Sequence, residues 1–102
     1  MIFITMKYII SEGRLDKIMT NYLDSFLTSK QILDYDDSIV IADPNADDDN
    51  PHWTEYMFYN FDDEDLWVNN QFIEEFSYLF GKEYEESLSF IKDWFKKEFN
   101  LK

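Results

Sequence analysis

The chain has 102 residues and a formal net charge of −13, with 22 acidic and nine basic residues. A surface this negative repels nucleic acids and anionic lipids and attracts basic partners. The sequence has no cysteine, which excludes disulfides and thiolate metal sites, and aromatic residues make up 20% of it, which argues against a disordered chain.

The length predicts a single domain over residues 1–102 with one hydrophobic core. Residues 1–10 are apolar but lack the basic start and the small-residue cleavage site of a signal peptide. No segment reaches the ~18–20 apolar residues of a membrane span. We therefore expect a cytoplasmic protein that binds no membrane, no nucleic acid directly and no cofactor.

The first half of the chain predicts a strand, a helix and a second strand. Residues 1–10 (MIFITMKYII) have the composition of a strand, although Met6 is an alternative natural start that would shorten it. A 3.6-residue apolar period then predicts an amphipathic helix over residues 12–28. The residues that form this period are Leu15, Ile18, Met19, Tyr22, Leu23, Phe26 and Leu27. Residues 29–37 are expected to be a connection, and residues 38–42 (SIVIA) a short β-branched strand.

The second half predicts two more strands and then two helices. After a polar loop, residues 53–61 (WTEYMFYNF) form an aromatic strand, residues 62–65 a turn, and residues 66–68 the start of another strand. Asn69 or Asn70 caps the next helix, Gly81 follows its end, and residues 82–100 form the last helix. The order β-α-β-β-β-α-α predicts an α+β fold, with a small, mostly antiparallel sheet and helices packed on one of its faces.

The densest charge lies in residues 34–65, which hold twelve carboxylates and no Lys or Arg. This stretch carries nearly the whole net charge, so the rest of the chain is almost neutral. Because the stretch also contains predicted strands, we expect its acids to lie on the loops of a folded sheet rather than in a tail.

Part of this stretch is similar to a calcium-binding loop. The pattern Asp43-x-Asn45-x-Asp47-x-Asp49 has the alternating oxygen ligands of the first half of an EF-hand. Asp48, however, stands where that loop needs glycine, and Thr54 stands where it needs a bidentate glutamate. We therefore expect a solvated loop and no metal site, with weak binding of divalent cations left open.

His52 is the only histidine of the chain, and no serine-centred turn accompanies it. A hydrolase triad therefore has no support in the sequence. Carboxylate pairs are abundant, but acid–base catalysis needs one of them in an apolar pocket that raises its pKa, and the turn at residues 62–65 is expected to be exposed. We predict no catalytic residue and no enzyme activity.

Both ends of the chain resemble a group of small, acidic, uncharacterised proteins of tailed phages. The resemblance rests on Met6-Lys7-Tyr8-Ile9-Ile10-Ser11-Glu12 at the start, and on Phe80-Gly81-Lys82-Glu83-Tyr84 and Trp94-Phe95-Lys96-Lys97-Glu98-Phe99 at the end. It covers about the first 25 and the last 25 residues. It implies a viral origin, and with it the cytoplasm of a host cell, but no activity.

The leading functional hypothesis is a non-enzymatic protein whose acidic surface binds a basic host or viral protein, as a nucleic-acid mimic that inhibits a defence nuclease. Carboxylates two residues apart on a strand lie ~7 Å apart and so approximate a row of phosphates. The residues expected at this surface are Asp43, Asp47, Asp48, Asp49, Asp62, Asp63, Glu64 and Asp65, with the aromatic Trp53, Tyr56 and Phe58. The alternative is a structural or assembly protein, such as a homodimer or virion component held by the exposed side of the aromatic strand, in which the acids serve only solubility.

Overall fold

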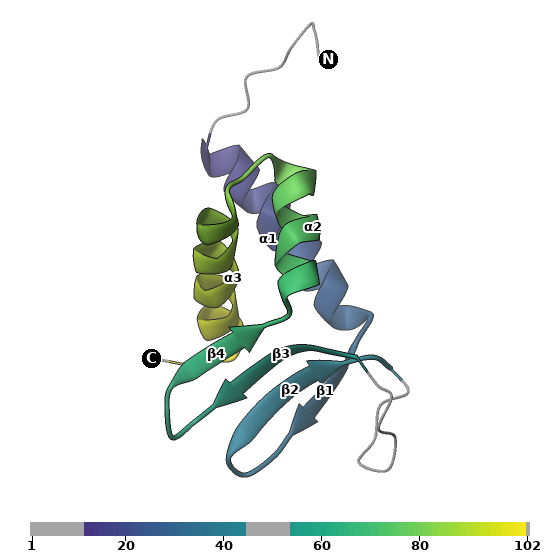
Figure 1. Cartoon of the computed structure of the whole chain (residues 1–102), viewed down its shortest axis with the longest axis vertical. Coiled ribbons are helices and arrows are strands. Elements are labelled where there is room, and N and C mark those ends of the chain that lie inside the picture. Colours follow the sequence, from purple (N-terminus) through teal and green to yellow (C-terminus); the bar gives the residue numbers. More distant parts are fainter. Residues whose placement is uncertain (1–11, 45–53, 102) are drawn as a thin grey trace, which may run out of the picture.

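The computed structural model describes residues 12–44 and 54–101, and these form three helices and a four-stranded sheet (Figure 1). In chain order the elements are α1 (Glu12–Thr28), β1 (Gln31–Asp34), β2 (Ser38–Ala42), β3 (Glu55–Asn60), β4 (Asp65–Val68), α2 (Asn70–Phe80) and α3 (Tyr84–Glu98). The sheet is antiparallel, with the order β1-β2-β3-β4. The predicted α+β fold is confirmed, whereas the strand predicted over residues 1–10 lies outside the described residues.

Local sequence signals account for the ends of the helices. α1 has the bounds predicted from its apolar period. The side chain of Asn69 caps α2, and Gly81 ends it in the left-handed conformation, with φ of 62°. α3 begins at Tyr84, two residues later than predicted, because the N–H of Glu83 is satisfied by the carboxylate of Glu86 at 3.1 Å. None of the described helices combines the length and the apolar character needed to cross a membrane.

The prediction that residues 29–37 form only a connection was wrong, because they contain β1. This strand has two apolar residues in its sequence QILD, too few to give a recognisable period. It forms because the backbone groups on the outer edge of β2 pair with it, from Gln31 opposite Ala42 to Asp34 opposite Ile39. β3 is shorter than the predicted strand over residues 53–61, and β4 begins one residue earlier than expected, at Asp65.

One face of the sheet packs against all three helices and forms the core, which confirms the predicted arrangement (Figure 1). The sheet contributes Ile39, Ile41, Met57, Tyr59, Leu66 and Val68, and the helices contribute Met19, Leu23, Phe72, Ile73, Phe76, Ile91, Trp94 and Phe95. A hydrogen bond of 2.9 Å from Trp94 Nε1 to Asp24 Oδ1 also joins α3 to α1. The sheet is therefore held on a rigid helical layer.

The opposite side of the sheet, named here the open face, carries a row of four apolar residues. Leu33, Val40, Phe58 and Trp67 come from one strand each and lie opposite one another in the strand register. Leu33 and Phe58 pack on the buried Val40 and Ala42, in a small cluster separate from the core. Trp67, at the end of the row, is 49% exposed. The row thus continues from a covered centre to an aromatic ring in solvent.

Candidate functional site

Two hairpin turns bring acidic residues from distant parts of the sequence to one end of the sheet. In an antiparallel sheet of this order, the turn between β1 and β2 and the turn between β3 and β4 lie at the same end. The backbone confirms their proximity, because the N–H of Phe61 donates a hydrogen bond of 3.0 Å to the carbonyl of Asp37. The acidic end, as this surface is named here, consists of Asp34, Asp36, Asp37, Asp62, Asp63, Glu64 and Asp65.

Side chains and backbone in these turns satisfy one another and leave the carboxylates exposed. Asn60 organises the second turn, because its side-chain oxygen accepts from the N–H groups of Asp62 (2.8 Å) and Asp63 (3.1 Å). Glu64 has φ of 53°, which reverses the chain before β4. In the first turn, the hydroxyl of Ser38 donates to Asp37 at 3.2 Å. The turns are thus fixed by their own hydrogen bonds, and the acids are presented on an ordered frame.

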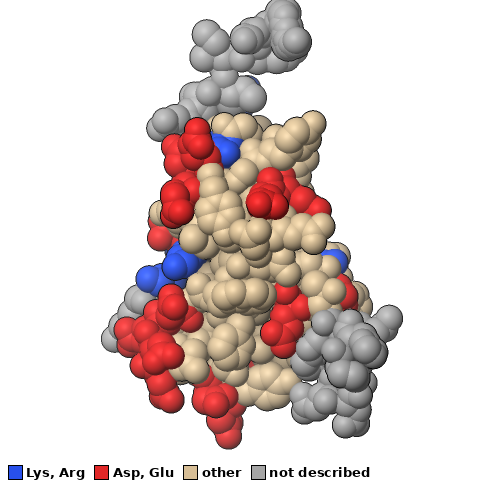
Figure 2. Space-filling view, in the orientation of Figure 1, with Lys and Arg blue, Asp and Glu red and all other residues tan. Residues whose placement is uncertain are grey.

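Little positive charge balances the acidic end. Lys92 Nζ of α3 lies 3.8 Å from Asp65 Oδ1, with side chains that are 38% and 75% exposed. An exposed pair at this distance contributes at most about 1 kcal/mol. Figure 2 shows acidic residues at the sheet end of the molecule, beside a smaller basic group, and further acidic groups over the helices. Within the described part of the chain, no three acidic or histidine side chains converge to hold a metal ion.

The structure does not bring all the predicted acidic residues together. Asp62, Asp63, Glu64 and Asp65 belong to the acidic end, but Asp43 follows β2 and lies at the other end of the sheet. The six residues of β3 separate the two ends by ~20 Å. Asp47, Asp48, Asp49 and Trp53 lie outside the described residues, as does most of the calcium-like loop. The acids that lie beside the second turn are those of residues 34–37, and not Asp43 as predicted.

Tyr56 lies on the helix side of the sheet and not on the open face. A bulge where β2 pairs with β3 interrupts the alternation of side chains. As a result the ring of Tyr56 packs against those of Phe26 and Phe72, with distances between ring centroids of 5.2 Å and 6.3 Å. Its hydroxyl donates to Asp43 Oδ1 at 2.8 Å. Burial, this hydrogen bond and the nearby carboxylates of Asp43 and Glu75 raise the pKa of Tyr56. Tyr56 therefore has a structural role, as part of the joint between β3 and the helices.

Phe58 does lie on the open face, next to Trp67 of β4. The sequence prediction included Phe58 but not Trp67, Asp34, Asp36 or Asp37. The signal for the three acids was present in the charge count of residues 34–65, but their nearness to the second turn depends on strand pairing, which the charge count does not contain.

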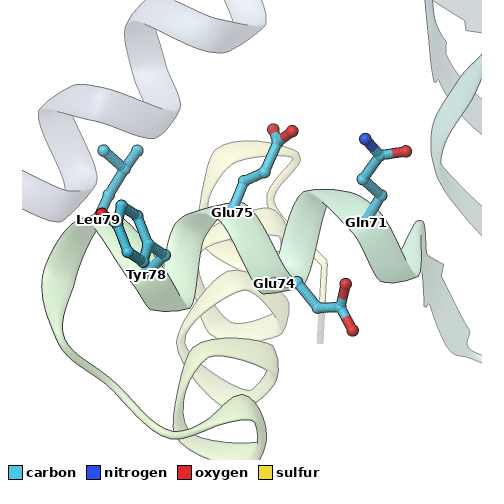
Figure 3. Close-up of a pocket in the computed structure, with 5 residues that line it drawn as sticks. All are labelled: Gln71, Glu74, Glu75, Tyr78 and Leu79. Carbon is cyan, nitrogen blue, oxygen red and sulfur yellow. The ribbon is translucent and has the colours of Figure 1, made fainter.

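A second surface feature, on α2, has a different character (Figure 3). It is an open hollow lined by Gln71, Glu74, Glu75, Tyr78 and Leu79, which all come from one side of this helix. Tyr78 and Leu79 are 88% and 55% exposed. Because one helix supplies the whole lining, the hollow encloses no volume in which a small molecule would be desolvated.

No family model matches the sequence, and no curated protein or solved structure is similar enough to it to count as a match. The resemblance of the chain ends to phage proteins therefore stays a prediction.

Proposed function

We propose that this chain is a non-catalytic acidic protein that binds a basic protein through its acidic end. The observation that carries the proposal is the gathering of seven exposed carboxylates on two adjoining turns, with Lys92 as a weak counter-charge. Like charges in this density create a local negative potential that steers a basic partner toward this end of the molecule. The helical layer behind the sheet serves as the scaffold.

The partner that best fits this charge is a protein whose own ligand is nucleic acid. Such proteins carry rows of Lys and Arg that neutralise phosphates, and a fixed group of carboxylates offers the same charge to the same side chains. Binding of the acidic end then excludes nucleic acid and inhibits the partner. The resemblance to phage proteins points toward a host defence nuclease as the partner of this kind.

The test compares two variants that lose four negative charges each. The first is Asp36→Asn, Asp62→Asn, Asp63→Asn and Glu64→Gln, at the acidic end. The matched control is Asp16→Asn, Glu74→Gln, Glu85→Gln and Glu98→Gln, at exposed positions on the helices. Both variants therefore have the same net charge, and they differ only in where the charge is lost.

The probe is a fluorescent lysine-rich peptide, titrated with each protein at low and high salt. Exposed ion pairs contribute about 0.2–1 kcal/mol each, so loss of four carboxylates at the binding site weakens affinity by at least about fourfold. The control variant is expected to bind more tightly than the acidic-end variant, and duplex DNA should displace the parent protein from the peptide. Equal affinity of the two variants would show that only the net charge matters, and would overturn the proposal.

A further inference from the structure

The open face adjoins the acidic end through β4. Asp65 and Trp67 are two residues apart on this strand, so they project from the same face, and their side chains start ~7 Å apart. Phe58 lies opposite Trp67, and Asn60 lies opposite Asp65. An apolar row that ends in an exposed indole thus lies directly beside a group of carboxylates.

A ring next to a carboxylate favours one type of cation. The guanidinium group of arginine is planar and weakly hydrated, stacks on aromatic faces, and pairs with a carboxylate through two parallel hydrogen bonds. The ammonium group of lysine is a compact, strongly hydrated point charge. An arginine side chain laid over Trp67 can reach Asp65 along the same strand and replace the exposed ion pair of Asp65 with Lys92. A lysine makes a cation–π contact with the ring as well, but it lacks the flat stacking and the paired hydrogen bonds of the guanidinium group.

Charge also decides between a partner and a second copy of this chain. A symmetric dimer through the open face would pack together two chains that each have a net charge of −13. The row has one residue from each strand, which is small beside the ~800 Å² per partner of a stable interface. A basic segment instead meets complementary charge at the acidic end and needs only a narrow apolar strip.

We propose that the open face docks an arginine-rich segment of the basic partner, with an arginine side chain between the Trp67 ring and the carboxylate of Asp65 and apolar side chains on Phe58. This inference rests on the proposed function, because the acidic end supplies the charge that attracts the segment. It adds the chemical identity of the partner's contact residues.

The experiment uses two peptides, one of repeating Arg-Ser-Leu units and one of repeating Lys-Ser-Leu units, with the same length and charge. The parent protein is expected to bind the arginine peptide roughly three- to tenfold more tightly, as measured by fluorescence anisotropy. Trp67→Ser should remove this preference. The matched control is Tyr78→Ser, which removes an aromatic ring that is 88% exposed on α2, and it should keep the preference.

A spectroscopic readout on the parent protein makes the result independent of the variants. Addition of the arginine peptide should shift the indole N–H resonance of Trp67, while that of the buried Trp94, which is hydrogen-bonded to Asp24, stays in place. Equal affinity for both peptides, an unmoved Trp67 resonance, or a dimer of the free protein that Trp67→Ser dissociates would each overturn the inference. If the acidic-end variant still loses binding while the two peptides bind equally, the inference fails and the proposed function stands.

Discussion

Asn69 is the residue at which the sheet and the helical layer are joined, and its replacement gives the sharpest test of the fold. Its side-chain oxygen accepts from the N–H groups of Gln71 (2.8 Å) and Phe72 (3.2 Å), in the first turn of α2. Its side-chain NH₂ donates to the carbonyl of Glu55 at 3.1 Å, at the start of β3. One half-buried amide therefore caps a helix and holds a strand that is not its neighbour in sequence.

The cost of Asn69→Ala follows from these contacts. Loss of an N-cap costs about 1 kcal/mol, and loss of a neutral hydrogen bond to a half-buried carbonyl costs about 1 kcal/mol more. The total of about 2 kcal/mol is a large part of the ~5–15 kcal/mol by which small domains are stable. Asn69→Ser keeps an oxygen for the cap but has no donor that reaches Glu55, so it should lose about half as much.

Urea denaturation followed by circular dichroism measures both variants. The transition midpoint should fall in the order parent, Asn69→Ser, Asn69→Ala, with an unchanged slope. The control is Asn70→Ala: this exposed neighbour bonds Glu74 and Tyr84 at the surface, and alanine improves helix propensity at its position, so the midpoint should change little. A midpoint for Asn69→Ala that matches that of Asn70→Ala would refute the assignment of Asn69 as the joint.

Two further predictions concern the helical layer. Gly81→Ala places a side chain at φ of 62° in open space, so thermal unfolding should show a loss of about 1 kcal/mol from backbone strain alone, and Gly81→Asn should lose less. Burial, and then the charge of Glu75, raise the pKa of Tyr22 above its ordinary value of 10.0. Because the fold favours the protonated phenol, the contribution of Tyr22 to stability should be constant below pH ~10 and be lost as the pH rises further. Urea midpoints measured across this range should fall less steeply for Tyr22→Phe, and an identical decline in parent and variant would exclude Tyr22 as a source of it.

The helices were predictable from sequence because their signals are local. An apolar period fixes α1 at Glu12–Thr28, and Asn69 and Gly81 mark the two ends of α2. Caps and periods act over three or four residues, so they need no knowledge of the tertiary structure. The buried strand β2 was predictable for a similar reason, since its sequence SIVIA is β-branched at three successive positions.

The acidic end could be predicted only in part, because it depends on pairing between strands. The charge count located the acids of both turns, but β1 has almost no signal of its own. It is the antiparallel pairing of β2 with β3 that places residues 34–37 next to residues 61–65 and Asp43 at the opposite end, and a charge count does not contain that pairing. The side of the sheet on which Tyr56 lies could not be predicted either. It depends on the bulge that directs its ring toward Phe26 and Phe72, and this bulge arises from the register of β2 and β3.

The hydrogen bonds that shape the two turns come mainly from the backbone and from Asn60 and Ser38, while Asp36, Asp62 and Asp63 contribute exposed carboxylates outside the core. Substitution at these three positions should therefore change the free energy of unfolding very little. A lineage that carries this chain can vary them one at a time and follow changes in the surface of a partner. The same separation lets an experimenter graft other short sequences onto the turns and use the domain as a display scaffold.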